Sequence, residues 1–309
     1  MNVSEWSLVI FTLLAQMAVG AFLVLGVVHF FAVRAAGVKE ADQLSDRALL
    51  PIGIVLVLGM LASLFHLGDP LNAPRALSNL ATSWLSWEIL FGVLFAVTGF
   101  IFALLQWRKI LTPTIRNLIA LLAGVFGLGL VYTMSMVYYS LPAVPAWNTL
   151  ATPISFFATT FLLGALSIGV AFVANYAYLK RKNAEGSEVQ LRLLRGSLRW
   201  LSLLAILMAG VHFVVLPLYA ASLAVVGSPA STQTANLLLG DFFVLFVLRL
   251  VLVFIGAAFL GFFLYQSAVR GERFAAISLL AYAAFVTVLI AEFMGRFLFY
   301  ATYARDGLL

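Results

Sequence analysis

The sequence predicts an all-α integral membrane protein with eight transmembrane helices, and two observations lead to this prediction. Of the 309 residues, 64% are apolar and only 10% are charged, and the mean hydropathy is +1.09. A water-soluble fold has too little interior to hide so much apolar surface. The apolar residues also form eight runs, each about as long as the roughly 20 residues that a helix needs to cross a bilayer.

The eight runs follow one another along the whole chain. They lie near residues 7–33, 49–67, 84–107, 116–139, 154–179, 198–220, 239–266 and 274–300. The opening stretch MNVSEW lacks the basic flank of a secretory signal, and the run after it is long enough to span. We therefore expect the first run to be retained as a helix.

The basic residues predict how the helices are oriented. Fourteen of the 18 Lys and Arg residues lie in the loops after the first, third, fifth and seventh runs. Because such residues are retained on the cytoplasmic side, both termini are expected on the outer, periplasmic side. This asymmetry also accounts for the net charge of +6, so membrane lipids, and no nucleic acid, are the expected surroundings.

The chain contains no Cys. This excludes disulfides, thiolate zinc sites and iron–sulfur clusters held by the chain itself. An iron–sulfur partner of this chain must therefore be another subunit.

The order of the polar residues predicts an internal repeat of two parallel four-helix units, residues 1–145 and 146–309. Similar apolar segments surround three pairs of residues, which the repeat aligns: His66 with His212, Glu88 with Asp241, and Gly20 with Gly164. Four helices return the chain to its starting side, so the axis that relates two such units runs along the membrane normal.

The segment FHLGDPLNAPRALSNLATSWLSWE, residues 65–88, places His66 and Glu88 at the outer ends of two neighbouring runs. A quinone site needs hydrogen-bonding groups for the carbonyls and an acceptor for the protons released on oxidation, and a His with a carboxylate supplies both. The residues expected around this pair are Asp69, Arg75, Asn79, Ser86 and Trp87. The alternative is a cluster that only caps helix ends and forms ion pairs, and both interpretations stay open at this point.

A second set of ionisable residues lies toward the outer side of the second repeat. Its members are His212, Asp241, Arg249, Glu292 and Arg296. Glu292 and Arg296 are one helical turn apart, a spacing that suits an ion pair. We expect this set to be a structural polar cluster, because the helix that carries His212 lacks the Gly-Asp-Pro turn that follows His66.

Two other uses of these residues are less well supported. A membrane haem needs two axial histidines at compatible depth, and His29 lies across the membrane from His66 and His212. A secondary transporter would suit the repeat and Arg249, but carrier sites lie near the bilayer midplane. No haem, no metal site and no catalytic residue for a terminal substrate is therefore predicted.

The outer loops, residues 140–153 and 221–240, are long and almost uncharged. Such loops favour a partner packed over this face, although loops in the lipid headgroup zone have a similar composition.

Three segments give the chain a resemblance to a known family. EWSLVIFTLLAQMAVGAF near the start, FHLGDPLNAPRALSNLATSWLSWEI in the middle and EFMGRFLFY near the end resemble the membrane anchor subunit of bacterial dimethyl sulfoxide reductase, the DmsC family. The similarity spans the whole chain, and the middle segment is its most specific part.

The resemblance implies a fold, a cofactor and partners. The family has eight helices with both ends outside, lies in the bacterial inner membrane and oxidises menaquinol for anaerobic respiration. It lacks haem, and its electrons pass to a docked iron–sulfur subunit and on to a molybdopterin catalytic subunit. Carried over, the menaquinol-binding residues are His66 and Glu88. A related quinone-reactive anchor of the polysulfide or nitrite reductase type, in which the reaction can run in the opposite direction, remains the alternative, together with the transporter.

Overall fold

The structure is a computed structural model that describes residues 3–65, 77–182 and 186–307. Within these ranges the chain forms helices joined by turns and short loops. The elements are, in order, α1 (Val3–Ala36), α2 (Val38–Ser45), η1 (Asp46–Ala48), α3 (Leu49–Leu64), η3 (Leu77–Asn79), α5 (Trp84–Arg108), α6 (Pro113–Tyr139), α7 (Ala151–Arg181), α8 (Ser187–Val226), α9 (Pro229–Asn236), the π-helical η4 (Leu237–Asp241), α10 (Phe243–Val253), the π-helical η5 (Phe254–Phe259), α11 (Leu260–Arg270) and α12 (Phe274–Ala301).

Eight helical segments in the described residues are long and apolar enough to cross a membrane, as predicted. Two of these spans are composite, because α2, η1 and α3 join into one and α10, η5 and α11 into another. Their outward side chains are largely apolar, among them Phe100, Leu121 and Val244. Apolar side chains face outward where lipid is the solvent, so the protein is a multi-pass membrane protein.

Both boundaries of α8 differ clearly from the prediction, because the helix begins at Ser187 and not near residue 198, and it ends at Val226 and not near residue 220. The stretch SEVQLRLLRGS is too polar to count as part of a span, yet it continues the helix beyond the apolar run. Leu194 is buried, and Gln190 Nε2 donates a hydrogen bond to the backbone oxygen of Glu40, 3.0 Å away. Tertiary contacts with α2 therefore hold this polar turn in place.

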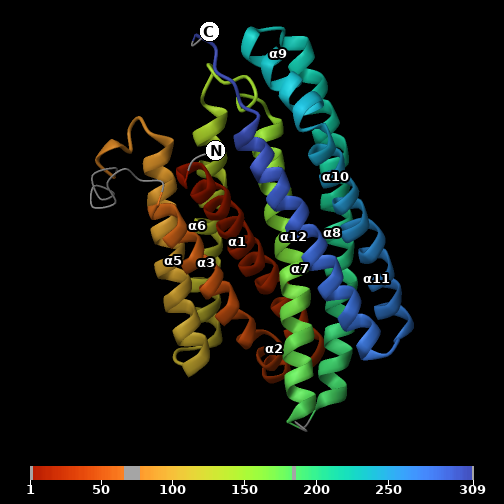
Figure 1. The fold of residues 1–309 in the computed structure, drawn as a ribbon. Helices are drawn as coiled ribbons and strands as arrows, with labels where there is room; N and C mark the ends of the chain where they lie inside the picture. Colours follow the sequence, from red (N-terminus) through yellow and green to blue (C-terminus); the bar gives the residue numbers. More distant parts are fainter. Residues whose placement is uncertain (1–2, 66–76, 183–185, 308–309) are drawn as a thin grey trace.

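Helices α1 and α7 form the centre of the bundle (Figure 1). α1 packs against α3 and α7, α5 packs against α6, and α8 and α12 pack against α7. The closest approach lies at Gly20 and Gly164, where a Cβ added to Gly20 would lie 1.8 Å from the backbone oxygen of Thr160. Only a residue without a side chain allows the two backbones to come this close.

The repeat of residues 1–145 and 146–309 stays a prediction. Gly20 and Gly164, the pair of glycines that it aligns, contact each other where α1 crosses α7. Such a contact is what an axis between these two helices would require. α1 begins and α12 ends at the same end of the bundle, where α9 also lies (Figure 1). We refer to this end as the terminal end.

Candidate functional site

Glu88 is buried near the start of α5, at the terminal end of the bundle. The helix starts after Ser83, whose Oγ accepts a hydrogen bond from the backbone N–H of Ser86 at 3.4 Å, and this cap fixes the first turn. Glu88 follows one residue after Trp87 and is only 7% exposed. Its carboxyl group has no hydrogen bond or ion pair among the described residues.

Two buried tyrosines lie within electrostatic range of Glu88. Tyr138 comes from α6 and Tyr300 from α12, and both side chains interact electrostatically with Glu88. Their hydroxyl oxygens are 2.7 Å apart, and either of them can be the donor of this hydrogen bond. This hydrogen bond therefore links α6, in the first half of the chain, to the last helix, α12.

The other residues predicted around Glu88 fall into two groups. His66, Asp69 and Arg75 lie outside the described residues, so their contact with Glu88 stays a prediction. Asn79 is exposed, and its backbone oxygen accepts hydrogen bonds from the N–H groups of the two residues before α5. Ser86 is buried, whereas Trp87 is 37% exposed and its ring stacks on that of Phe91.

A second polar cluster, which we call the Glu292 cluster, lies inside the second half of the chain. Thr159 Oγ1 donates a 2.6 Å hydrogen bond to Glu292 Oε2. Arg249 Nη2 lies 3.8 Å from the same oxygen, and His212 Nε2 lies 3.5 Å from Oε1. All four side chains are buried, and they come from α7, α8, α10 and α12. The sequence indicated His212, Arg249 and Glu292 for this cluster, but nothing in it pointed to Thr159.

Gly295 makes room for the arginine of this cluster. A Cβ added to Gly295 would lie 2.3 Å from both Cζ and Nε of Arg249. The guanidinium group therefore packs directly on the backbone of α12, one turn after Glu292. The sequence offered no reason to single out Gly295, because small residues are frequent in membrane helices.

Arg296 and Asp241 behave differently from the prediction. Arg296 forms no ion pair with Glu292; its Nη2 donates a 2.7 Å hydrogen bond to Gln16 Oε1 on α1, and its Cζ lies 3.9 Å above the ring of Phe156. The spacing of one turn placed both groups on one face, but the guanidinium group turns toward the interior helix α1. Asp241 is exposed in η4 and does not join the Glu292 cluster.

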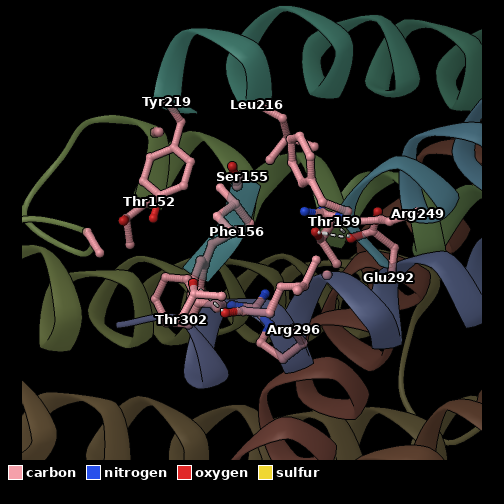
Figure 2. A pocket seen from close by; sticks show the side chains of 17 residues that line it. Thr152, Ser155, Phe156, Thr159, Leu216, Tyr219, Arg249, Glu292, Arg296 and Thr302 are labelled. Atoms are coloured by element: carbon pink, nitrogen blue, oxygen red, sulfur yellow. Dashed lines mark hydrogen bonds and ion pairs between the residues drawn. The ribbon is translucent and has the colours of Figure 1, made fainter. Parts of the chain in front are cut away.

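A pocket adjoins the Glu292 cluster, and Figure 2 shows the side chains that line it. The space that water molecules can occupy in it is about 70 Å³. Three of the lining residues are charged, Arg249, Glu292 and Arg296. Hydroxyl groups line the rest of its polar wall, from Thr152, Ser155, Thr159, Tyr219 and Thr302.

Several polar atoms at this cluster have no hydrogen-bond partner in the described part of the chain. They are Glu292 Oε1, Arg249 Nε and both ring nitrogens of His212. Buried polar groups in folded proteins are almost always satisfied by protein or by water. Since each water needs roughly 10–15 Å³ of such space, the pocket has room for about five of them.

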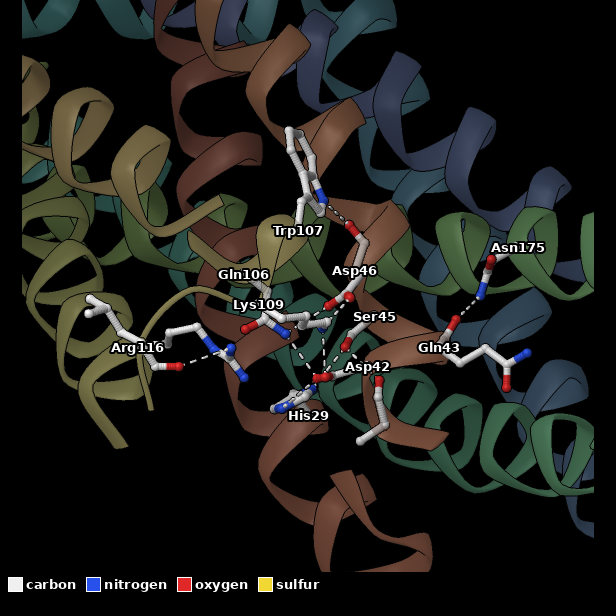
Figure 3. A network of polar contacts seen from close by, with 12 residues as sticks. His29, Asp42, Gln43, Ser45, Asp46, Gln106, Trp107, Lys109, Arg116 and Asn175 are labelled. Carbon is white, nitrogen blue, oxygen red and sulfur yellow. Dashed lines mark hydrogen bonds and ion pairs between the residues drawn. The ribbon is translucent and has the colours of Figure 1, made fainter. Parts of the chain in front are cut away.

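A third polar network joins the helices at the opposite end of the bundle (Figure 3). Lys109 Nζ lies 2.6 Å from a carboxylate oxygen of Asp42 and 2.6 Å from one of Asp46. Gln106 Nε2 donates to the same two carboxylates, at 2.9 and 2.8 Å. His29 Nδ1 lies 2.8 Å from Ser45 Oγ. We call this network the Lys109 clamp; it connects α1, α2 and η1 to the end of α5.

Comparisons with known proteins match most of the chain. Residues 1–302 match the family model described as the DMSO reductase anchor subunit (DmsC). The chain is 31% identical over 304 residues to one component of the anaerobic dimethyl sulfoxide reductase of Escherichia coli strain K12, covering 98% of this chain and 96% of that protein. It is also 28% identical over 184 residues to one component of the sulfite dehydrogenase of Allochromatium vinosum, covering 56% of this chain and 55% of that protein.

One solved structure has a similar fold at much lower identity. The bd oxidase from Geobacillus thermodenitrificans matches with a TM-score of 0.62 and 13% identity, covering 97% of this chain and 85% of that chain. At this identity the match concerns the fold alone.

Proposed function

Since the chain belongs to the dimethyl sulfoxide reductase anchor subunit (DmsC) family and is the membrane anchor of a reductase complex, we propose that it also oxidises quinol for that complex. Menaquinol binds near the terminal end, between His66 and Glu88. Two electrons leave to an iron–sulfur subunit and reach a molybdopterin catalytic subunit, which reduces the terminal acceptor in anaerobic respiration. The complex lies in the bacterial inner membrane.

The observation that carries this proposal is the buried carboxyl group of Glu88, which has no hydrogen bond or ion pair within residues 3–65, 77–182 and 186–307. An ionisable side chain within a membrane helix is expensive to desolvate, so it is retained where it has a function. Quinol oxidation releases protons, and a carboxylate next to the ring oxygen accepts them. A histidine at position 66 would bind the second oxygen and is suited to proton transfer near neutral pH.

The partner subunits are proposed to dock on the terminal end, facing the periplasm. There Asp306 connects two outer segments: its N–H donates to the backbone oxygen of Ala143 at 2.9 Å, and its Oδ1 accepts from the N–H of Ala230 at 3.0 Å. The loop 140–150, the start of α9 and the segment around Asp306 thus form one connected surface. Trp147 Nε1, which donates to the backbone oxygen of Phe299 at 3.0 Å, fastens this loop to α12.

Replacing Glu88 by Gln in the complete complex tests the proposed function. The amide keeps the size of the side chain but accepts no proton, so we expect quinol-driven acceptor reduction to fall by about 100-fold. Activity with an artificial electron donor, which bypasses the membrane anchor, should stay unchanged. His66→Ala should have the same pattern of effects.

The matched control for Glu88→Gln is Glu188→Gln, on an exposed residue at the start of α8. This variant should behave like the wild type with both donors. Equal losses with quinol and with the artificial donor in Glu88→Gln would contradict the proposal, because they would indicate a damaged complex and not a lost quinol reaction.

The partial match to a sulfite dehydrogenase component favours a second candidate, a complex that reduces quinone. The same residues would then deliver protons to quinone instead of accepting them from quinol. Measuring the reaction in both directions with the complete complex separates the two candidates.

A further inference from the structure

The Glu292 cluster and its pocket have no role in the quinol reaction proposed above, yet they contain buried groups that hold or exchange protons. Glu292 and His212 are 2% and 0% exposed. The pocket is lined by hydroxyl groups and contacts the loop before α7 through Ala146. A purely structural ion-pair cluster would leave fewer polar atoms unsatisfied, because each unsatisfied buried atom reduces stability.

The unpartnered atoms indicate that the pocket contains water. Glu292 Oε1 and Arg249 Nε have no hydrogen-bond partner among the described residues, and both side chains line the pocket. A void next to apolar groups alone stays dry, whereas one with several polar neighbours is filled. Water in this pocket therefore reaches the carboxyl group of Glu292.

The pocket is also separated from the tyrosine pair by a single layer of side chains. Tyr138 packs against Phe156 and Phe299, with ring centroids 5.9 and 5.1 Å apart, and both phenylalanines line the pocket from the other side. Arg296 is a lining residue too, and it interacts electrostatically with the hydroxyls of both Tyr138 and Tyr300. The two phenylalanines and the arginine thus form the boundary between the pocket and the tyrosine pair.

We propose that the protons released by quinol oxidation leave through this water-filled pocket, with Tyr138 and Tyr300 as the link from Glu88 and Glu292 as the proton-accepting group in the pocket. The inference rests on the proposed function. In this inference the pocket binds water, and the bound water carries protons away from the quinol site.

Electrons and protons both balance along this route. Quinol loses two electrons, which go to the iron–sulfur cluster of the partner subunit, and two protons, the first of which goes to the Glu88 carboxylate. A tyrosine hydroxyl accepts this proton on its oxygen and passes its own proton to the other hydroxyl, which either direction of the 2.7 Å hydrogen bond allows. A water beside Arg296 takes the proton into the pocket, where Glu292 accepts it before release at the terminal end. The second proton follows the same route once Glu88 is again a carboxylate.

Charged neighbours and burial act on Glu292 in opposite directions. Arg249 and Arg296 favour its carboxylate form, whereas burial disfavours it. The guanidinium group of Arg296 donates its hydrogen bond to Gln16 on α1. It therefore does not form a direct ion pair with Glu292.

The test measures quinol-driven turnover of the complete complex with Tyr300→Phe and with Glu292→Gln. Each variant keeps the shape of the side chain and removes one proton-transfer group. We expect kcat to fall by about tenfold or more with an unchanged KM for quinol, and the solvent deuterium isotope effect to rise. Activity with an artificial electron donor should stay as in the wild type.

The matched controls are Tyr303→Phe and Glu188→Gln, which change exposed residues outside the pocket. They should leave kcat and the isotope effect unchanged. If Tyr300→Phe and Glu292→Gln behave like these controls while Glu88→Gln is slow, the pocket is not the exit and the proposed function still holds. If the wild-type complex oxidises no quinol, the proposed function itself is wrong.

A measurement on the wild type covers the case in which a variant does not assemble. Hydroxyl-radical footprinting labels side chains next to bound water, so Phe156 in the pocket, which is 1% exposed, should be labelled faster than Phe172, which is 0% exposed and lies outside the pocket. Labelling of Phe156 as slow as that of Phe172 would mean a dry pocket and would overturn the inference.

Discussion

Gly295 shows how much of the Glu292 cluster depends on a residue without a side chain. The Arg249 guanidinium occupies the space of a Cβ at this position, with Nη2 only 2.6 Å from where it would be. Because the guanidinium group lies between α10 and α12, any side chain at position 295 pushes it away from Glu292. The backbone of α12 is thus part of the binding site for this arginine.

Replacing Gly295 by Ala should therefore destabilise the protein, although alanine is the better helix former. We expect a loss of about 1–3 kcal/mol in the free energy of unfolding, because the added methyl group overpacks a buried site. Denaturation of the purified protein in detergent measures this change.

Gly99→Ala is the matched control, since nothing lies within 4 Å of a Cβ added at this helical position. This variant should be as stable as the wild type or more stable by up to about 1 kcal/mol. Equal effects of the two substitutions would mean that the contact with Arg249 does not determine the stability at position 295.

The sequence allowed part of the Glu292 cluster to be predicted, for a physical reason. Ionisable residues are so rare in membrane helices that His212, Arg249, Glu292 and Arg296 stood out. Thr159 and Gln16, which bind two of them, did not, because uncharged polar side chains occur in membrane helices without a special role. Spacing along one helix also said nothing about which neighbouring helix a long side chain reaches, so the predicted ion pair of Glu292 with Arg296 was wrong.

The connection between α5 and α6 is held to the rest of the bundle by the Lys109 clamp. Lys109 has a φ of 52°, in the left-handed region that residues with a side chain rarely adopt. This conformation ends α5 and lets its ammonium group reach the carboxylates of Asp42 and Asp46. The clamp thus joins the hairpin of α5 and α6 to α2, which has few other contacts with it.

Replacing Lys109 by Met should weaken this junction. Two carboxylates would then face each other without the ammonium group, but Lys109 is 44% exposed and solvent screens the interaction. We therefore expect a loss of only about 1 kcal/mol in the free energy of unfolding.

Arg108→Met provides the comparison for Lys109→Met, because Arg108 is exposed and neighbours Lys109 in the sequence. Its removal should change the stability by less than about 0.5 kcal/mol. The two variants are measured by denaturation in detergent at the same pH, and a larger loss for Arg108→Met would contradict the role of the clamp.

The number of helices was predictable and the irregular elements were not. Eight apolar runs gave eight spans because the thickness of a bilayer imposes a minimum length on each helix. The short helices α2 and α9 contain mostly polar residues, whose pattern resembles a loop. The π-helical turns η4 and η5 contain mostly apolar residues, whose pattern resembles an unbroken helix. Their shapes arise from contacts with neighbouring helices, such as that of Gly256 with Val288, and such contacts leave no periodic signal.

The arrangement of the eight spans places Glu88, the tyrosine pair and the Glu292 pocket at one end of the bundle, with the Lys109 clamp at the other. Residues that handle protons thus gather where the outer loops form a connected surface. An electron acceptor docked there would lie close to the proposed quinol site, and distance limits electron transfer. The functional proposal therefore depends on which side of the membrane the terminal end faces.

Single introduced cysteines test this orientation directly, because the chain has no Cys of its own. Gln233 is exposed on α9 at the terminal end, and Lys182 is exposed where α7 ends at the opposite end (Figure 1). A membrane-impermeant maleimide added to intact bacterial cells, with the outer membrane opened, should label Gln233→Cys and leave Lys182→Cys unlabelled. Breaking the inner membrane should make Lys182→Cys reactive, which shows that its thiol is accessible.

This outcome is expected because 14 of the 18 basic residues lie in the connections or helix ends on the side that carries Lys182, and the side rich in Lys and Arg stays in the cytoplasm. The opposite labelling pattern would place the terminal end in the cytoplasm. The partner subunits would then have to dock from the cytoplasm, and protons from quinol would be released on that side. The orientation of the chain thus decides whether protons are released to the periplasm. The uneven distribution of Lys and Arg between the two sides would therefore determine the direction of proton release for the whole complex.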